Sequence, residues 1–539
     1  MTTESAGGAD AEALAGVRFL RSFDGRSAPD DLLADIAAGR ASGATLFRAR
    51  NVDTPGQVRA LCAELQAARP AGDPPLVIGF DQEGGQLQMV GDGATAWPGN
   101  LALGAAASVD LARRCGRAIG AEVAAMGGTL VYAPVCDVLA RSSATPLGTR
   151  PFGDDPLRVG PLAAAVTAGL QEAGVAATLK HFPGHGAATS DSHHGLPVIE
   201  HDRARLERDE LPPFRVAIAA GALAVLPGHL AVPALTGGAP IPATFARPIL
   251  VDLLRGELGF DGVTVSDALD MRGAAHDGGL GSVVGAAANA GMDLLLLNHP
   301  AETERAAHRA LAAAIAAGEL DGDALLAARD RILALRRHLA EVMQPRLDVV
   351  GCEEHRRLAR EIADASVTLL RDPGRALPLA PGSGRVAVVC PEPADLTPAE
   401  TSSYLRIGLG DALRARGLDV AEFTTALDPA PAQVDALVGV LAGYDLVVAG
   451  TFDAVSFAGQ AALVSALVSA LVERKRVVAV ALRSPYDLAL YPDGVAAAAT
   501  YGIQAPQIEA LADALTGRIP FAGRLPVVLP APGEMEKPR

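Results

Sequence analysis

Short β-branched apolar runs alternate with helical stretches through the first 300 residues. Helical stretches rich in alanine, leucine and arginine follow most of the runs, at 54–68, 108–126, 156–173, 203–221 and 303–317. Strands that are apolar on both faces and alternate with helices indicate a buried parallel sheet. Eight units within roughly 330 residues favour a (β/α)8 barrel over an open doubly wound sheet. The eight runs begin at Val17, Gly43, Pro75, Thr129, Val175, Leu223, Gly262 and Met292.

The pattern changes after a Pro/Gly-rich break, "LRDPGRALPLAPGSG", that begins at Leu370. Beyond it, the apolar runs "RVAVVC", "YDLVVAG", "RVVAVAL" and "VAAAATYG" alternate with helical stretches at 401–416, 456–473 and 505–516. We therefore predict a (β/α)8 barrel over 1–340, a helical linker over 341–365 and a smaller open α/β sandwich domain over 366–539. No motif that carries chemistry is visible in this second half.

Charge and cysteine usage narrow the possible partners and compartment. The chain of 539 residues carries a net charge of −16, which argues against a nucleic-acid partner. Its 5 cysteines are scattered and form no C-x-x-C pair, as is usual in a reducing compartment. No secretory signal and no apolar run of about 18 residues is visible. We expect a cytoplasmic protein without a membrane partner.

Polar residues stand where most of the predicted strands end. In a (β/α)8 barrel the carboxyl ends of the strands converge on one rim, and that rim carries the active site. Any one of these residues can simply mark the end of a strand, but loop composition alone favours Gly, Asn and Ser over Lys, His and Asp. The residues are Asp81, Asp137, Lys180, His181, His229, Asp267 and Asn298.

The stretch "KHFPGHGAATSDSHHGLP", from Lys180 to Pro197, concentrates ionisable side chains on one loop. It holds four of the 11 histidines and one of the three lysines. One interpretation is a loop-built metal site around His181 and His185, and a second is a purely structural loop. A third is acid/base chemistry, because Asp191 and His193 are two residues apart and share a face in an extended segment. A carboxylate there raises the pKa of the imidazole and orients it for proton transfer.

An acid/base group needs partners elsewhere on the rim. Asp267, in "VSDALDM", follows a strand, where an aspartate also often caps a helix. Asp81 and Glu83, in "GFDQEGG", precede two glycines that let a ligand approach the backbone closely. Arg150, in "TRPFGDDP", precedes the helical stretch at 156, where an arginine is also common as solvated surface.

Four motifs together resemble glycoside hydrolase family 3: "DQEGG", "TRPFG", "KHFPGHG…DSH" and "LGFDGVTVSDALDM". Within that family they are similar to the bacterial β-N-acetylhexosaminidases, the N-acetylglucosaminidases of peptidoglycan recycling. The resemblance covers about 1–340 and extends more loosely over the second half. It implies a retaining exo-β-N-acetylglucosaminidase that acts on terminal N-acetylglucosamine, possible muropeptide fragments included, with no cofactor and no metal ion.

The resemblance also implies residue roles. Asp267 is the nucleophile that forms a covalent glycosyl-enzyme, and His193 is the acid/base group oriented by Asp191. The sugar is held by Asp81, Arg150, Lys180 and His181. Three alternatives stay open: a β-N-acetylglucosaminide phosphorylase with the same site, a family 3 β-glucosidase whose acid/base is a glutamate of the second domain, and a non-catalytic sugar-binding relative.

Three positions depart from the family pattern. Relatives commonly carry arginines after "DQEGG", where this chain has Gln86 and Met89. Many relatives also have "SDD" where this chain has Ala268 after Asp267. These departures put in doubt how the substrate is recognised and how the nucleophile is hydrogen-bonded.

Overall fold

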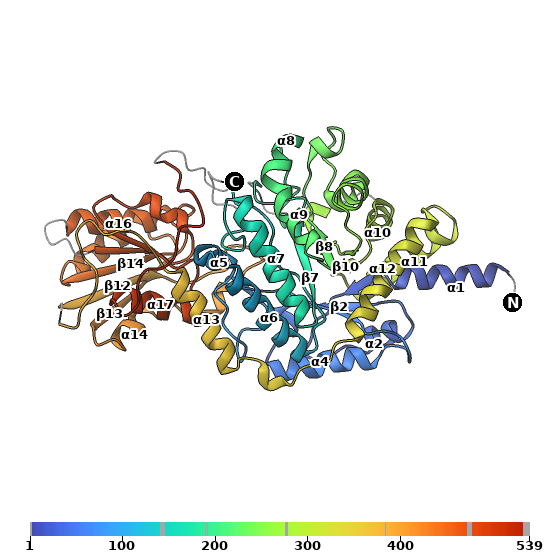
Figure 1. The fold of residues 1–539 in the computed structure, drawn as a ribbon, viewed down its shortest axis with the longest axis horizontal. Coiled ribbons are helices and arrows are strands. Elements are labelled where there is room, and N and C mark those ends of the chain that lie inside the picture. The colour runs from blue at the N-terminus through green and yellow to red at the C-terminus, as the bar shows by residue number, and fades with distance from the viewer. Residues whose placement is uncertain are drawn as a thin grey trace.

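The eight apolar runs of the N-terminal half form the eight strands of one curled parallel sheet (Figure 1). They lie in the order β10-β1-β2-β3-β6-β7-β8-β9, and a parallel bridge between Val265 and Leu294 links the last strand to the first. The ring therefore closes, and the predicted barrel is confirmed. The strands are β1 (Phe19–Arg21), β2 (Gly43–Leu46), β3 (Val77–Phe80), β6 (Leu130–Val131), β7 (Ala176–Phe182), β8 (Ala224–Pro227), β9 (Val263–Thr264) and β10 (Leu295–Leu297).

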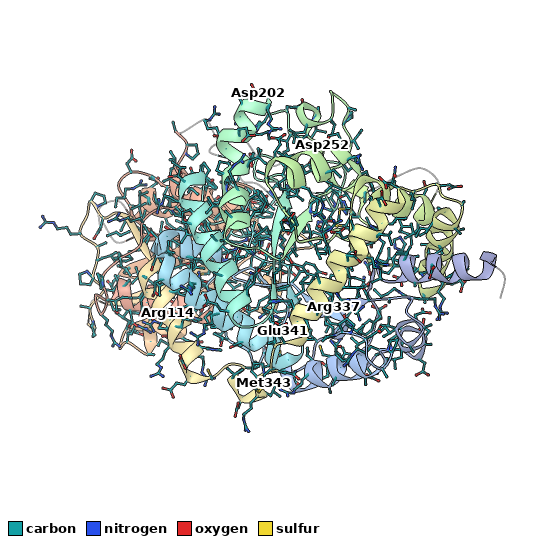
Figure 2. All side chains as sticks on the ribbon, turned by 45° about the vertical axis from the view of Figure 1, so that its right-hand side comes forward. Arg114, Asp202, Asp252, Arg337, Glu341 and Met343 are labelled. Carbon is teal, nitrogen blue, oxygen red and sulfur yellow. The ribbon has the colours of Figure 1, made fainter. Side chains whose placement is uncertain are left out.

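Helices surround this ring and shield its apolar strands from water. The computed structural model describes residues 3–140, 146–188, 190, 192–274, 279–382, 384–471 and 477–531. Charged side chains such as Arg114, Asp202 and Arg337 point outward from the helical layer (Figure 2). The helices include α1 (Thr3–Gly16), α2 (Asp30–Ala37), α3 (Arg48–Asn51), α4 (Pro55–Ala67), α5 (Asn100–Ala106), α6 (Val109–Met126), α7 (Pro156–Glu172), α8 (Arg203–Arg205), α9 (Leu211–Ala219), α10 (Gly279–Ala290), α11 (Ala301–Ala316) and α12 (Gly322–Ala340).

The C-terminal half forms a second, open sheet in the order β11-β16-β15-β14-β12-β13. The four predicted apolar runs are its central parallel strands, and two edge strands, β11 and β13, were not predicted. β11 pairs antiparallel with β16, so the sheet is mixed. The strands are β11 (Thr368–Arg371), β12 (Arg385–Pro391), β13 (Asp419–Thr425), β14 (Leu446–Thr451), β15 (Val477–Ala481) and β16 (Ala496–Ala499).

Helices cover both faces of this sheet (Figure 1), and alternate residues of its central strands belong to two different cores. Val388, Val448 and Val480 pack with α14 (Leu409–Arg414) and α17 (Ala505–Leu515). Ala449 and Ala479 pack with α15 (Pro431–Leu441) and α16 (Ala458–Ala470). This three-layer sandwich confirms the predicted architecture of the second half.

The barrel and the sandwich are joined through α13 (Glu353–Ser366), which follows α12 and packs against α5, α6 and α17. Helix α5, a barrel element, also contributes Leu101 and Ala105 to the core beneath the second sheet. The limits 1–340, 341–365 and 366–539 stay a prediction. Within the described residues, no helix is long and apolar enough to cross a membrane.

Candidate active site

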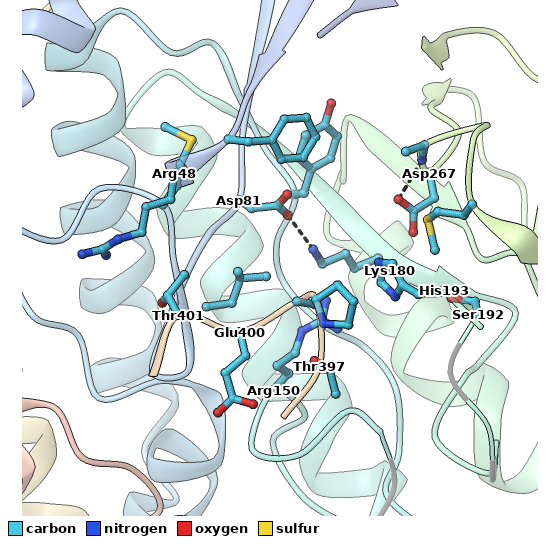
Figure 3. A pocket seen from close by; sticks show the side chains of 18 of the residues that line it. Arg48, Asp81, Arg150, Lys180, Ser192, His193, Asp267, Thr397, Glu400 and Thr401 are labelled. Carbon is cyan, nitrogen blue, oxygen red and sulfur yellow. Dashed lines mark hydrogen bonds and ion pairs between the residues drawn. The ribbon is translucent and has the colours of Figure 1, made fainter. Parts of the chain in front are cut away.

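A cavity of about 420 Å³ opens where the carboxyl ends of the barrel strands meet (Figure 3). Its walls come from the loops that follow β2, β3, β7, β9 and β10, and from the segment 395–404 of the C-terminal half. Asp267, His193 and Ser192 lie on one side of it, Arg48 and Thr401 lie on the other, and Asp81 and Lys180 lie between them (Figure 3). Six predicted site residues line this one cavity: Asp81, Arg150, Lys180, His181, His193 and Asp267. The seventh, Asp191, lies outside the described residues.

Asp267 follows β9 and faces the cavity rather than capping a helix. The backbone N–H of Ala268 donates to its Oδ1 at 2.8 Å, and the next helical turn begins only at Arg272. Burial by itself raises the pKa of Asp267, but the nearby imidazoles of His229, His181 and His193 outweigh it, and the pKa lies below its usual value. Asp267 is therefore an ionised carboxylate over the ordinary pH range. The helix-cap alternative is wrong.

His229 holds the backbone next to Asp267. Its Nε2 lies 3.1 Å from the carbonyl oxygen of Ala268, so Nε2–H donates to that oxygen, and its Nδ1 lies 2.7 Å from the hydroxyl of Thr244. Burial lowers the pKa of His229 despite the negative charge of Asp267. A neutral His229 therefore anchors the carbonyl of Ala268, the residue whose backbone N–H donates to Asp267.

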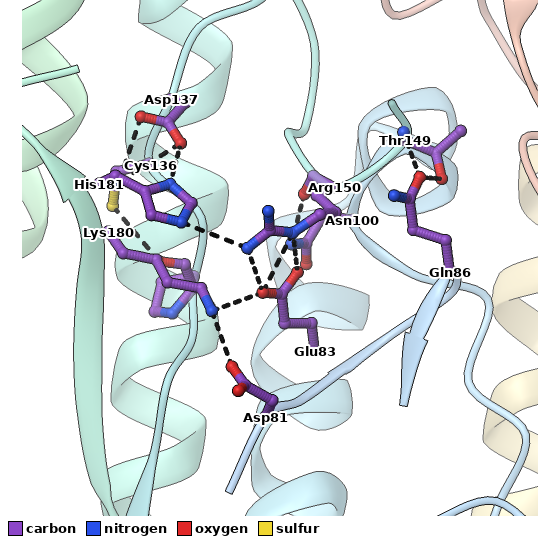
Figure 4. A network of polar contacts seen from close by, with 11 residues as sticks. Asp81, Glu83, Gln86, Asn100, Cys136, Asp137, Thr149, Arg150, Lys180 and His181 are labelled. Carbon is purple, nitrogen blue, oxygen red and sulfur yellow. Dashed lines mark hydrogen bonds and ion pairs between the residues drawn. The ribbon is translucent and has the colours of Figure 1, made fainter. Parts of the chain in front are cut away.

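Glu83 is the centre of a buried cluster of charges between Asp81 and the barrel wall (Figure 4). Its Oε1 accepts from Lys180 Nζ at 2.6 Å and from Arg150 Nη2 at 2.8 Å, and its Oε2 accepts from Arg150 Nε at 3.0 Å. Lys180 Nζ also donates to Asp81 Oδ1 at 3.0 Å. One carboxylate thus positions both cations that the sequence assigned to the sugar.

The charges in this cluster set each other's protonation. Burial by itself raises the pKa of Glu83, but Arg150 and Lys180 lower it to about 2. Burial by itself lowers the pKa of Lys180, yet Glu83 and Asp81 raise it above its usual value. Burial raises the pKa of Asp81, and Glu83 adds to the rise while Lys180 opposes it. The cluster offers an ammonium donor and a carboxylate acceptor, Asp81, side by side.

His181 is held as a neutral imidazole. Its Nδ1 lies 2.7 Å from Asp137 Oδ2, and its Nε2 lies 3.3 Å from Arg150 Nη2. Because a guanidinium can only donate, Nε2 accepts and Nδ1–H donates to Asp137. Burial and the cations Arg150 and Lys180 lower the pKa of His181 well below its usual value. Within the described residues, no three His, Cys, Asp or Glu side chains are placed to hold a metal ion.

Lys180 and His181 are consecutive, yet both side chains line the cavity. In a regular strand they would point to opposite faces. The pairing of β7 with β8 shifts register between Lys180 and Phe182, and such an irregularity re-aims a side chain. This local shift brings both polar side chains to the site.

The two glycines after Glu83 do not serve the role that the sequence suggested. Gly84 and Gly85 have φ of +85° and +62° and form the turn between β4 (Gln82–Gly84) and β5 (Leu87–Gln88). A Cβ on Gly84 would lie 2.9 Å from Trp97 Cβ, and one on Gly85 would lie 3.0 Å from Gly99 Cα. Glycine is thus required at both positions by the positive φ of the turn and by the close approach of Trp97 and Gly99, and not by a ligand.

Comparisons with known proteins show the family of the chain. The model of the glycosyl hydrolase family 3 N-terminal domain matches residues 22–335. The chain belongs to glycosyl hydrolase family 3. The β-hexosaminidases of Thiobacillus denitrificans and Pseudomonas aeruginosa are 40% identical over 265 residues and 42% identical over 267 residues. These matches span 48% and 49% of this chain and 72% and 77% of those proteins.

A solved family 3 structure matches nearly the whole chain. The β-N-acetylglucosaminidase from Paenibacillus sp. str. FPU-7 superposes with a TM-score of 0.88 at 35% identity and covers 96% of this chain and 98% of that one. A β-glucoside phosphorylase at 22% identity and a TM-score of 0.79 shares the fold. The likeness to the Paenibacillus enzyme includes the C-terminal sandwich as well as the barrel.

The C-terminal half of this family 3 chain supplies part of the cavity wall, which the sequence did not reveal. Asp395, Thr397, Glu400, Thr401 and Tyr404 all line the cavity. Glu400 is the glutamate there, but its two oxygens accept from Arg483 at 3.0 and 3.1 Å, from Ser402 Oγ at 2.6 Å and from Leu396 N at 3.0 Å. Both oxygens of Glu400 are thus already engaged by donors of the protein, which argues against the β-glucosidase alternative.

Two of the three departures from the family pattern, Met89 and Ala268, line the cavity. Met89 is 1% exposed and lines the cavity beside Gln88, whose carbonyl accepts from Arg48 Nη1 at 3.0 Å. The Arg48 guanidinium lies 4.2 Å from the centre of the Tyr404 ring, so a cation from another loop stands on this side of the cavity. Ala268 acts through its backbone, as described above for Asp267.

Replacing Glu83 by glutamine is expected to destabilise the protein by about 3–5 kcal/mol, because Arg150 and Lys180 would be left buried without their shared carboxylate. A thermal melt measures the loss. Glu207→Gln is a matched control, since that glutamate also pairs with two arginines but is 35% exposed. Its loss should stay below about 1 kcal/mol. Equal losses in the two variants would contradict the prediction.

The stability lost in Glu83→Gln relative to wild type should depend on pH. The pKa of Glu83 falls from 4.5 to about 2 on folding, so its contribution is complete above pH 4.5 and is lost as the pH falls toward 2. The difference in melting temperature between wild type and Glu83→Gln should therefore shrink between pH 4.5 and pH 2. A difference that is constant with pH would show that Glu83 is not held as a carboxylate.

Proposed function

We propose that the chain is a retaining exo-β-N-acetylglucosaminidase that hydrolyses terminal β-linked N-acetylglucosamine. The observation that carries this proposal is the shared cavity, since Asp267, His193 and the Lys180–Asp81 pair all line it. Support also comes from relatives named β-hexosaminidase at about 40% identity and from the Paenibacillus β-N-acetylglucosaminidase. We further propose a cytoplasmic location and muropeptide fragments among the substrates.

The proposed reaction has two displacements at the anomeric carbon. In the first, the carboxylate of Asp267 attacks that carbon while His193 donates a proton to the oxygen of the leaving group, and the glycosidic bond breaks. In the second, His193 accepts a proton from water, and the water oxygen displaces Asp267. Two inversions return the sugar with its original β configuration. In this proposal Asp191 orients His193, as the resemblance implies.

The part of the cavity next to Asp267 and His193, around Asp81 and Lys180, is proposed to bind the sugar hydroxyls. Lys180 and Arg150 carry N–H donors, Asp81 accepts hydrogen bonds, and the pKa of Asp81 is raised by burial. The neutral imidazole of His181 adds no charge next to the oxocarbenium-like transition state, whose positive charge the carboxylate of Asp267 stabilises. Binding and chemistry thus fall on neighbouring parts of one rim.

A chromogenic aryl β-N-acetylglucosaminide tests the proposal. Wild-type protein should release the phenol, and proton NMR should show β-N-acetylglucosamine as the first product. Inorganic phosphate should leave the products unchanged, whereas N-acetylglucosamine 1-phosphate would identify a phosphorylase. An α first product would rule out retention. No turnover of several aryl glycosides, with N-acetylglucosamine still bound in calorimetry, would favour the sugar-binding alternative.

A further inference from the structure

Gln86 lies on the turn between β4 and β5, where the barrel meets the C-terminal sandwich (Figure 4). Its side-chain Oε1 accepts from Thr149 N at 2.7 Å, from Thr149 Oγ1 at 2.9 Å and from Arg483 Nη2 at 3.2 Å. A carbonyl oxygen that takes three donors in a buried place acts as an acceptor only. An arginine, which relatives commonly carry here, could accept none of these bonds and would place a second cation beside Arg483.

Arg483 follows β15 and reaches the barrel from the C-terminal half. Its side chain is 4% exposed, and its partner Glu400 is 0% exposed. Asp453 lies a further 3.6 Å from Nη1. The carboxylate of Glu400 accepts from Nε and Nη2 and holds the guanidinium in one orientation, so the second N–H of Nη2 is directed at Gln86.

The backbone of the same turn is also bound by the C-terminal half. Thr401 N donates to the carbonyl oxygen of Gln86 at 2.7 Å, and Gln88 N donates to Thr401 Oγ1 at 3.2 Å. Gln504 Nε2 donates to the carbonyl oxygen of Gly85 at 2.8 Å. The turn between β4 and β5 is therefore bound by three residues, Thr401, Arg483 and Gln504, that lie more than 300 positions away in the chain.

These contacts bear on the buried charge cluster of Glu83, Arg150 and Lys180, because Gln86 lies near both partners of its central ion pair. Glu83 lies three residues before Gln86 on the hairpin, and Arg150 directly follows Thr149. Gln86 thus ties together the two segments that carry the Glu83–Arg150 ion pair, and Glu83 in turn holds Lys180. A displacement of the turn would change the position of both cations in the cavity.

We propose that Gln86 and Arg483 are positioning residues, through which the C-terminal sandwich orients the Arg150–Glu83–Lys180 cluster for sugar binding. The inference rests on the proposed function, because it assumes that this cluster binds the sugar. It assigns the second half of the chain a part in substrate affinity, beyond covering the barrel.

Gln86→Met and Arg483→Met, singly and together, test the proposal in the full chain. Each single variant should raise both KM for the aryl β-N-acetylglucosaminide and the inhibition constant of N-acetylglucosamine by about tenfold. The double variant should lose little more than either single one, because both act through one contact. Gln86→Glu keeps the acceptor oxygens and should stay within about threefold of wild type.

Arg416→Gln is the matched control. Arg416 also pairs with two carboxylates, but these partners, Glu509 and Asp513, lie within the C-terminal half and not on the barrel. It should lower the melting temperature and leave KM unchanged. If the Gln86 and Arg483 variants likewise lose only thermal stability, or if their effects on KM multiply in the double variant, the proposal is overturned.

Failure of the proposed function gives a different result. In that case wild-type protein shows no glycosidase activity, and calorimetric affinity for N-acetylglucosamine replaces KM in the same cycle of variants. A tenfold loss of affinity in both single variants supports the positioning role even then, and unchanged affinity overturns it. Circular dichroism of each variant confirms that the protein measured is folded.

Discussion

Asp267→Ala is expected to lower kcat for an aryl β-N-acetylglucosaminide by about 10⁴-fold or more, with KM changed far less. In the proposed mechanism no covalent intermediate can form without this carboxylate, and its charge no longer stabilises the oxocarbenium-like transition state. The lowered pKa of Asp267 keeps it ionised, so the loss should be similar across the ordinary pH range.

The control for this variant is Asp261→Ala. Asp261 is exposed and lies at the opposite end of the strand that presents Asp267, on the far face of the barrel. Its removal should change kcat by less than about twofold. Added azide should restore part of the turnover in Asp267→Ala and give the α-glycosyl azide, because the small anion attacks where the carboxylate stood. A loss of only tenfold in Asp267→Ala would mean that another group is the nucleophile.

His193→Ala is expected to show the second largest effect, about 10²- to 10⁴-fold on kcat/KM. The size should depend on the leaving group. A glycoside of a poorly acidic alcohol needs a proton from His193, whereas a nitrophenyl glycoside needs little general-acid catalysis because nitrophenolate is a good leaving group. The loss should therefore be greatest for the alkyl glycoside.

The pH profile gives an independent check of the same role. A protonated imidazole must donate, so the wild-type rate should fall as the pH rises through the pKa of an imidazole-like group, and this limb should be absent in His193→Ala. His194→Ala is the matched control, because that neighbouring histidine is exposed and does not line the cavity. An alkaline limb that persists in His193→Ala would assign the proton to another residue.

The barrel could be predicted because its signal is local. Each strand is an apolar run buried on both faces, and the spacing of eight such runs is readable without knowing their partners. The edge strands of the second sheet lacked this signal. Strands β13 and β11 each pair with one neighbour only, β12 and β16 respectively, and both are mostly part-exposed. Edge strands are half-solvated, so their residues carry no continuous apolar pattern.

By itself, the sequence determined the barrel, the sandwich and the set of polar residues at the strand ends, since each follows from the order of residues within one segment. The tertiary structure alone decided that Glu83 joins Lys180 to Arg150, that Lys180 and His181 face one cavity, and that Thr401 and Arg483 close over Gln86. These contacts join residues far apart in the chain. Their geometry depends on how whole elements pack, and no local pattern of residues encodes that packing.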